Sequence, residues 1–398
     1  MKQYVLVFNC GSSSIKFAII DARNGAAPLS GLAENLGNQD SCLSYQFQGK
    51  KNAVDLPTCA DHRQALTAIE DTLALHNDLQ QQLLAVGHRV VHGGEKFIQS
   101  SLINDAVKHA IADISPMAPL HNPANLAGIE RAQKAFSHLP HVAVFDTAFF
   151  HTMPQHAYLY ALPYDLYEQH GIRRYGFHGS SHRFVAQQAA TMLGKHFSTC
   201  NLITAHLGNG CSIAAIKQGR AVDTSMGFTP LEGLVMGTRC GDIDPNIPTF
   251  LIEERGYTAS EVTTLLNKKS GFAGISGLSN DCRTLEEQAQ LGHEMAQLAL
   301  DIFAYRLAKY IGAYLVVAGA LDALVFTGGI GENSALIRSK TIAHLQHLGF
   351  DLNEEHNLAQ RFGQSGPINS VHSIAIYAIA TNEEWVIAQD AIQYAQQA

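Results

Sequence analysis

Two glycine-rich segments far apart in the chain carry residues suited to phosphate binding. Residues 9–14 and 208–212 each interrupt an apolar run with Gly, Ser and Asn. A hairpin tip of this kind exposes backbone N–H groups that can donate to phosphate oxygens, although most such tips only turn the chain. Because the pattern returns about half a chain later, it predicts a duplicated domain that closes on a nucleotide.

Two arginines stand among glycines. Arg89 lies within Gly87–Gly94, and Arg239 lies within Gly237–Gly241. Small neighbours let a guanidinium approach an anion and bind it with two parallel N–H groups. The formal net charge is −8, so an anion site needs local cations. One such arginine usually belongs to the surface or to an ion pair, whereas two indicate an anion-binding site.

Residues 175–182 present His178 and His182 in a stretch rich in Gly and Ser. If the stretch is helical, the two imidazoles share a face and could bind a metal. The glycines argue against a helix at His178, and no carboxylate or cysteine is close in sequence. A histidine on such a loop is better suited to donate to developing charge. A solvated loop histidine remains the alternative.

The segment Thr327–Asn333 lies between a predicted strand and a predicted helix. Open α/β sheets bind ligands at the carboxyl ends of their strands, and glycines there allow close backbone approach. The phosphate loop G-x-x-x-x-G-K-[ST], a strand-linked G-x-G-x-x-G and the protein-kinase motifs are missing from the sequence. A nucleotide would therefore be held by other turns, although Thr327–Asn333 could also be an ordinary turn.

Short β-rich runs alternate with helical stretches, which is typical of an α/β protein. The predicted strands are residues 4–8, 14–20, 86–91, 142–145, 202–207, 212–216, 323–326 and 374–380. The predicted helices are a long one over about 284–318, one from about 334 and a terminal one from about 382. A chain of 398 residues exceeds what one core usually serves. We expect two domains, 1–150 plus 383–398, with the terminal helix packing back, and 151–382.

Composition narrows the class of protein. Seven cysteines stand singly in the sequence, which indicates reduced thiols rather than a disulfide framework. The acidic net charge gives no basic surface for nucleic acid, and the longest apolar run, residues 311–321, is too short to span a bilayer. We expect a cytoplasmic protein with no nucleic-acid or membrane partner.

Seven blocks, in order over nearly the whole chain, resemble the acetate and propionate kinase family: Asn9–Lys16, Gly87–Gly94, Tyr175–Gly179, His206–Gly210, Gly237–Arg239, Thr327–Asn333 and Thr381–Glu384. The resemblance implies two duplicated actin-like (ribonuclease H-like) α/β domains with a nucleotide cleft between them, the second domain binding the nucleotide. It implies acetate kinase activity, which is reversible in-line transfer of the ATP γ-phosphoryl group to acetate, giving acetyl phosphate and ADP. It also implies magnesium, with manganese as an alternative, and a homodimer.

The resemblance assigns roles to individual residues. Asp146 would be the acid/base residue, and His178 and Arg239 would stabilise the transition state. Asn9 and Glu383 would bind the magnesium ion. Arg89 would bind the substrate carboxylate in an apolar pocket of Val91, Leu120, Phe177 and Pro230. ATP would be held by Lys16, His206, Leu207, Gly208, Asn209, Gly210, Asp281, Cys282, Arg283, Gly329, Ile330, Gly331, Glu332 and Asn333.

Physical chemistry modifies one of these roles. A free carboxylate, with a pKa of about 4, is already ionised at neutral pH and needs no general base. We therefore expect Asp146 to orient an arginine or a metal-bound water. If Val91 shares a strand with Arg89, both side chains point to the same side, and Val91 would pack on the acetate methyl group.

Three other functions fit parts of the pattern. They are a propionate kinase, an actin-like regulatory or scaffolding ATPase, and a sugar or glycerol kinase. A slow ATPase needs no anion pocket beyond the γ-phosphate, whereas the sequence offers Arg89, Arg239 and His178 together. A sugar kinase needs a base for a neutral hydroxyl and a polar pocket, so the carboxylate kinase is favoured.

Overall fold

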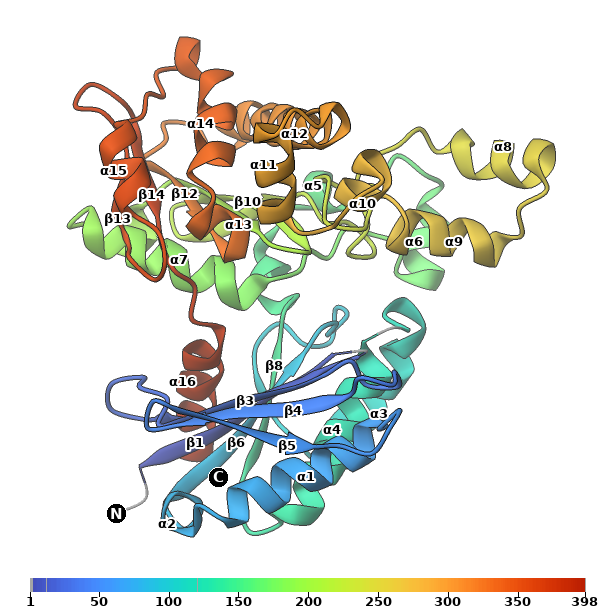
Figure 1. Cartoon of the computed structure of the whole chain (residues 1–398), viewed down its shortest axis with the longest axis vertical. Helices are drawn as coiled ribbons and strands as arrows, with labels where there is room; N and C mark the ends of the chain where they lie inside the picture. Colours follow the sequence, from blue (N-terminus) through green and yellow to red (C-terminus); the bar gives the residue numbers. More distant parts are fainter. Residues whose placement is uncertain (1–2, 12, 120, 398) are drawn as a thin grey trace. The chain divides into compact units, whose positions relative to one another are not determined.

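The computed structural model describes residues 3–11, 13–119 and 121–397. The chain forms two compact units (Figure 1). Unit 1 comprises Met1–Phe149 and Asn382–Ala398, and unit 2 comprises Phe150–Thr381. Within the described residues, no helix is long and apolar enough to cross a membrane.

Unit 1 is built on an eight-stranded sheet in the order β5-β4-β3-β2-β1-β6-β8-β7. The strands are β1 (Tyr4–Cys10), β2 (Ile15–Asp21), β3 (Leu29–Glu34), β4 (Cys42–Phe47), β5 (Lys50–Asp55), β6 (Leu83–Val90), β7 (Ser101–Leu102) and β8 (His141–Phe145). The helices are α1 (His62–Ala74), α2 (Asn77–Gln80), α3 (Asp105–Ile114), α4 (Asn122–Ala135) and α16 (Glu383–Ala395).

Alternation along β1 explains why helices cover both faces of this sheet. Leu6 and Phe8 pack in one core with residues of α1 and α4, whereas Val5 and Val7 pack in another core with residues of α16. Successive strand residues point to opposite faces, so an apolar run buried on both sides requires two helical layers. The C-terminal helix α16 therefore completes unit 1.

Unit 2 is built on a six-stranded sheet in the order β11-β10-β9-β12-β14-β13. Its strands are β9 (Leu202–Leu207), β10 (Cys211–Lys217), β11 (Arg220–Thr224), β12 (Ala323–Thr327), β13 (Gly366–Pro367) and β14 (Ala375–Ala378). Its helices are α5 (Gln155–Tyr158), α6 (Tyr164–His170), α7 (Gly179–Met192), α8 (Asn246–Arg255), α9 (Ala259–Lys268), α10 (Gly271–Ser276), α11 (Cys282–Gln290), α12 (Glu294–Ala318), α13 (Gly328–Asn333), α14 (Ala335–Ala343) and α15 (Glu354–Ala359).

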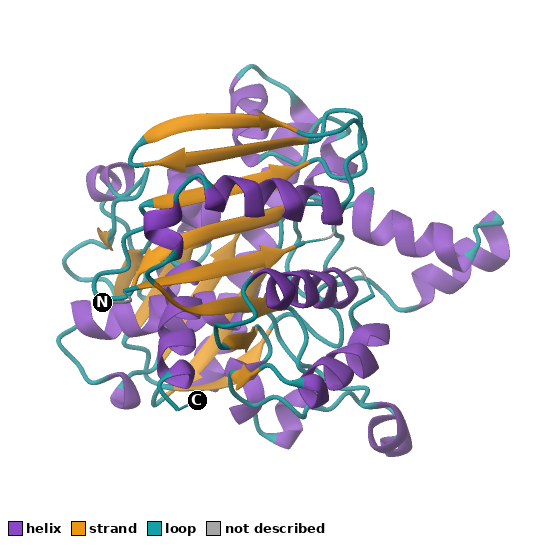
Figure 2. Cartoon of the chain, turned by 90° about the horizontal axis from the view of Figure 1, so that it is seen from below, coloured by secondary structure: helices purple, strands orange, loops and turns teal. Residues whose placement is uncertain are grey.

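The two sheets, whose strands are orange in Figure 2, have the same strand topology at their centres. In unit 1 the run β3-β2-β1 is antiparallel, and β1, β6 and β8 are parallel. In unit 2 the run β11-β10-β9 is antiparallel, and β9, β12 and β14 are parallel. Duplication of an α/β domain, predicted from the paired hairpins β1–β2 and β9–β10, is confirmed.

The predicted elements differ from the structure in three places. The helix predicted over 284–318 is two helices, α11 and α12, because the chain turns at Gly292 with φ of 90°. Thr327–Asn333 is not a turn, since Gly328–Asn333 forms the short helix α13. Strands β3, β4, β5, β7, β11 and β13 were not predicted, because β7 and β13 are only two residues long and the others mix polar and exposed residues with their apolar ones.

Candidate active site

A polar cluster lies at the carboxyl ends of three parallel strands of unit 1. Asn9 is near the end of β1, Arg89 is near the end of β6, and Asp146 directly follows β8. Glu383 is the first residue of α16. Parallel strands end at one edge of a sheet, so residues far apart in sequence converge there.

The centre of this cluster is the guanidinium of Arg89. Its Nη2 donates to Asp146 Oδ2 at 2.7 Å and its Nε donates to Asp146 Oδ1 at 3.0 Å. Its Nη1 donates to Asn9 Oδ1 at 3.3 Å, and Glu383 Oε2 lies 3.7 Å from Nε. Burial alone would lower the pKa of Arg89, but the carboxylates of Asp146 and Glu383 outweigh it and raise this pKa. Arg89 is therefore a fixed cation.

Asn9 and Glu383 fit the magnesium role proposed for them. Glu383 Oε2 is buried, and within the described residues it accepts no hydrogen bond. A buried carboxylate oxygen without a donor is costly unless a cation binds it. Magnesium takes oxygen ligands, keeps several waters and needs only one or two carboxylates. One amide oxygen and one carboxylate around a single arginine match that requirement.

Replacing Glu383 with glutamine tests this assignment. The amide keeps the shape but removes the charge, so we expect the concentration of Mg²⁺ that gives half-maximal activity to rise about tenfold, a cost of about 1.4 kcal/mol. Glu384→Gln is the matched control, because the neighbouring carboxylate pairs with Lys16. A Mg²⁺ requirement that moves equally in both variants would contradict the assignment.

The structure bears on three other residues that the sequence placed in the site, all in unit 1. Lys16, predicted to hold ATP, lies opposite Asn9 on β2 and pairs with Glu384. Strand β6 ends at Val90, so Val91 lies beyond it, and the same-strand premise for its orientation is wrong. The backbone N–H of Val91 donates to Asn125 Oδ1 at 3.0 Å, which turns the chain away from the ladder. Leu120 lies outside the described residues.

A second cluster lies in unit 2, around the tip of the β9–β10 hairpin. His178 occupies the N-cap position of α7, and its backbone is left-handed with φ of 58°. Its ring stacks on His206 of β9 with centroids 4.3 Å apart. Arg239 lies beside them, because a Cβ placed on Gly210 would meet Arg239 Nη1 at 3.4 Å and His178 Cε1 at 3.5 Å. The structure thus brings two predicted residues, His178 and Arg239, to one glycine, and a third, His206, stacks on His178.

The environment of Arg239 differs from that of Arg89. Its Nη1 donates to the carbonyl of Pro230 at 2.8 Å and lies 3.7 Å from Met236 Sδ. Within the described part of the chain, Arg239 forms no ion pair with a carboxylate. Burial lowers its pKa, although the guanidinium remains charged because arginine pKa values lie far above neutrality. A partly buried cation without an acidic partner is suited to an anionic ligand.

The loop that carries Arg239 is tied to the hairpin tip. The N–H of Gly237 donates to the carbonyl of Asn209 at 3.0 Å, and a Cβ on Gly237 would overlap Asn209 Oδ1. Asn280 Nδ2 donates to the same Oδ1 at 3.1 Å. A side chain at 237 would displace the Asn209 amide, so the close approach that this glycine allows is made to the Asn209 side chain.

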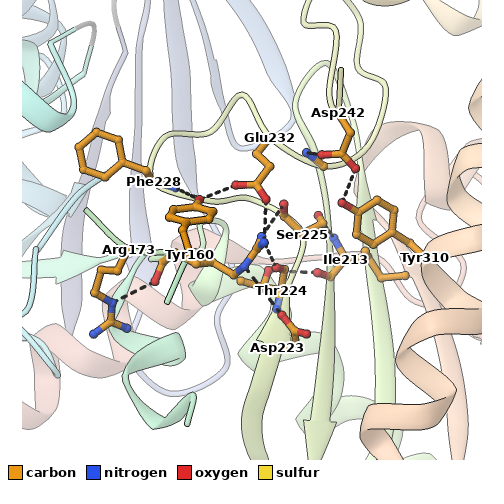
Figure 3. Close-up of polar contacts among 12 residues, drawn as sticks. Tyr160, Arg173, Ile213, Asp223, Thr224, Ser225, Phe228, Glu232, Asp242 and Tyr310 are labelled. Carbon is orange, nitrogen blue, oxygen red and sulfur yellow. Dashed lines mark hydrogen bonds and ion pairs between the residues drawn. The ribbon is translucent and has the colours of Figure 1, made fainter. Parts of the chain in front are cut away.

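A partly buried polar network supports the loop that carries Pro230 (Figure 3). Glu232 accepts from Tyr160 Oη at 2.5 Å and from Arg174 Nη2 at 2.7 Å. The same Tyr160 oxygen accepts from the N–H of Phe228 at 2.8 Å. Arg174 also donates to the carbonyls of residues 224 and 225 at 2.9 and 3.0 Å. The network fixes residues 224–232, and hence the carbonyl that holds Arg239.

A cavity of about 890 Å³ opens in unit 2 beside the hairpin tip and is large enough for a nucleotide. Eight predicted ATP-binding residues line it: Gly208, Asn209, Asp281, Cys282, Arg283, Gly329, Ile330 and Asn333. It is also lined by residues that the sequence did not indicate: Asn280, Glu286, Glu287, Gln290, Ser334, Arg361, Phe362 and Gly363. No sequence motif marks Glu286–Glu287 or Arg361–Phe362. Only the tertiary structure shows that they line the cavity.

Five predicted ATP-binding residues of unit 2 do not line this cavity: His206, Leu207, Gly210, Gly331 and Glu332. Glu332 Oε1 accepts from the N–H groups of Gly328 and Thr381, at 2.9 and 3.0 Å. Its carboxylate therefore binds backbone N–H groups of the protein itself. His206 Nδ1 is 2.8 Å from Ser181 Oγ, which places its ring at the His178 cluster.

The comparisons with known proteins identify the family of this chain. Residues 4–389 match the model of the Acetokinase family. The acetate kinases of Shewanella frigidimarina and Shewanella woodyi are 57% and 55% identical to this chain, over 98% of each chain. The propionate kinase structure from Francisella tularensis has a TM-score of 0.94 at 44% identity, and the acetate kinase structure from Porphyromonas gingivalis has 0.91 at 43%. Both cover 98% of this chain and 99% of theirs.

The duplicated α/β fold and these relatives define an actin-like phosphotransferase that acts on a carboxylate acceptor. ATP and ADP are its co-substrates. The chain belongs to the Acetokinase family.

Proposed function

We propose that this chain transfers the γ-phosphoryl group of ATP reversibly and in line to acetate, giving acetyl phosphate and ADP. The observation that carries the proposal is the partly buried Arg239, which has no carboxylate partner in the described structure and lies with His178 beside Gly210. Phosphoryl transfer needs positioning and stabilisation of three equatorial oxygens, and these two side chains are donors of the required kind.

Arg89 would bind the acetate carboxylate. Asp146 occupies the Nε and Nη2 edge of its guanidinium, which fixes the direction of the remaining Nη1. Magnesium, bound through Asn9 and Glu383, would neutralise phosphate charge. Unit 2 would hold ATP in the 890 Å³ cavity, with its phosphates near Gly208 and Asn209.

Acid preference distinguishes the proposal from a propionate kinase, the name of one structural neighbour. We expect an ATP-dependent hydroxamate assay with formate, acetate, propionate and butyrate to give the highest kcat/KM with acetate. An added methylene gains at most about 0.8 kcal/mol by burial but must find room in a packed wall.

The same assay separates the other classes of function. A preference for propionate would replace acetate as the substrate but keep the carboxylate kinase. ATP hydrolysis that no carboxylic acid accelerates would instead support a regulatory or scaffolding ATPase.

We further propose a cytoplasmic homodimer. All seven cysteines are free thiols, which suits a reducing compartment. Helix α8 buries none of its residues, and Ile247, Phe250 and Ile252 are 41%, 49% and 41% exposed. Exposed apolar groups of this size commonly mark protein interfaces, and light scattering of the purified chain would give its mass in solution.

A further inference from the structure

Four side chains of unit 2 form one hydrogen-bonded row that ends at His178. Thr204 Oγ1 of β9 is 2.7 Å from Nδ1 of His182 on α7. His182 Nε2 is 2.8 Å from Ser212 Oγ of β10, and that oxygen is 2.9 Å from His178 Nδ1. Thr204, His182 and Ser212 are each 0% exposed. Bulk water therefore cannot reach these three side chains, and their polar hydrogens must find acceptors within the protein.

His182 contributes only one hydrogen to this row. Burial lowers its pKa well below the usual value, and the neighbouring His206 lowers it further. The ring is therefore neutral, with a hydrogen on one nitrogen and a lone pair on the other. Each hydroxyl also has one hydrogen, so three hydrogens are available for three bonds.

Counting these hydrogens selects a direction for the row. If His182 donated from Nδ1 to Thr204, the Thr204 hydroxyl hydrogen would have no acceptor among the described residues. In the opposite direction, Thr204 donates to His182 Nδ1 and His182 Nε2–H donates to Ser212. Ser212 then donates to His178 Nδ1, so every hydrogen is used. A buried hydroxyl hydrogen without an acceptor costs free energy, so the second direction is favoured.

We propose that Thr204, His182 and Ser212 are positioning residues that keep the hydrogen of neutral His178 on Nε2. The inference rests on the proposed function, in which His178 donates to the transferring phosphoryl group. Because Nδ1 accepts from Ser212, the neutral ring keeps a donor at Nε2, and the protonated ring has one there too. His178 can therefore donate whether it is neutral or charged.

The charged and titratable neighbours show why a neutral donor is useful. His206 stacks on His178, and Arg239 lies at the same glycine, Gly210. Burial raises the pKa of the Cys211 thiol to about 12, so it adds no negative charge. A nearby cation disfavours a second positive charge on imidazole. The row would supply a hydrogen-bond donor without requiring that charge.

Proton positions on the ring can be read without any assay of activity. We expect two-bond ¹H–¹⁵N spectra of protein labelled in histidine, recorded above neutral pH, to show His178 Nδ1 as unprotonated and Nε2 as protonated. His178→Gln assigns the signals by their loss. Protonation at Nδ1, or shifts averaged between two tautomers, would overturn the proposal. If the tautomer is as expected but acetate is not phosphorylated, only the proposed function fails.

Variants of Thr204 test whether its hydroxyl group sets the direction of the hydrogen bonds in the row. Thr204→Val removes the first hydroxyl hydrogen at similar volume, so we expect the His178 shifts to become averaged. Wild-type kcat should stay level from mildly acidic to mildly alkaline pH, whereas in Thr204→Val it should fall several-fold as pH rises, because the neutral ring no longer always carries Nε2–H. Thr204→Ser should restore both properties.

Thr341→Val is the matched control, because it removes another fully buried threonine hydroxyl from unit 2, one that donates to the carbonyl of Ile337. It should leave the spectrum and the pH profile unchanged. Ser212→Ala interrupts the row at its centre and serves if Thr204→Val does not fold. If the folded Thr204→Val or Ser212→Ala protein keeps the wild-type ¹⁵N chemical shifts of His178, the proposal that this row sets its tautomer is overturned.

Discussion

Replacing Arg239 with alanine should lower kcat at least about 100-fold while ATP binding changes little. Losing a preorganised donor to a transition-state anion costs about 2.7–4 kcal/mol in other enzymes. Arg239 contacts a carbonyl and a thioether in the absence of ligand. Its contact with phosphoryl oxygens would strengthen as their charge develops, so the loss should fall on kcat rather than on nucleotide affinity.

This substitution should leave the fold intact. Within the described residues Arg239 has no carboxylate partner, so its removal strands no buried negative charge. Arg239→Lys should recover little activity, because an ammonium cannot bind two oxygens in a fixed plane. Arg220→Ala, which removes an exposed arginine from β11 of the same unit, is the control. A kcat of Arg239→Ala within about twofold of wild type would remove Arg239 from the mechanism.

Asp146→Asn should reduce kcat/KM for acetate about 100-fold, equivalent to about 2.7 kcal/mol. Asp146 is fully buried and accepts from both donors on the Nε and Nη2 edge of the Arg89 guanidinium. An amide offers one acceptor oxygen in place of two, and truncating one partner of a buried charge pair commonly costs 2–5 kcal/mol. We expect the loss because Arg89 would no longer present Nη1 to the substrate in one direction.

The pH dependence separates this positioning role from acid/base catalysis. If Asp146 only orients Arg89, the log kcat–pH profile of Asp146→Asn should run parallel to that of wild type. Disappearance of a carboxyl ionisation limb would instead show that Asp146 moves a proton. Asp21→Asn is the control, since it makes the same change in a buried aspartate of unit 1 that pairs with Arg23. Its activity should stay near wild type.

The two arginines show what the sequence could and could not distinguish. Both stand among glycines, and the sequence placed both in anion binding without separating their environments. In the structure, Arg89 is surrounded by Asp146, Asn9 and Glu383, which come from three other elements. Among the residues that the structure describes, Arg239 donates only to the Pro230 carbonyl and the Met236 sulfur. Parallel strand pairing and helix packing decide which cation is neutralised, and these are contacts between residues far apart in sequence.

By itself, the sequence determined the duplicated α/β architecture and the segments that form both clusters. Apolar runs, glycine-rich tips and the acidic start of α16 are local signals, because strand alternation and helix capping depend on neighbouring residues. Tertiary structure alone decided the break at Gly292, the backbone role of Glu332 and the place of Arg361 at the cavity. It alone also joined Thr204 to His178, since β9, β10 and α7 must pack before one hydrogen-bonded row can form.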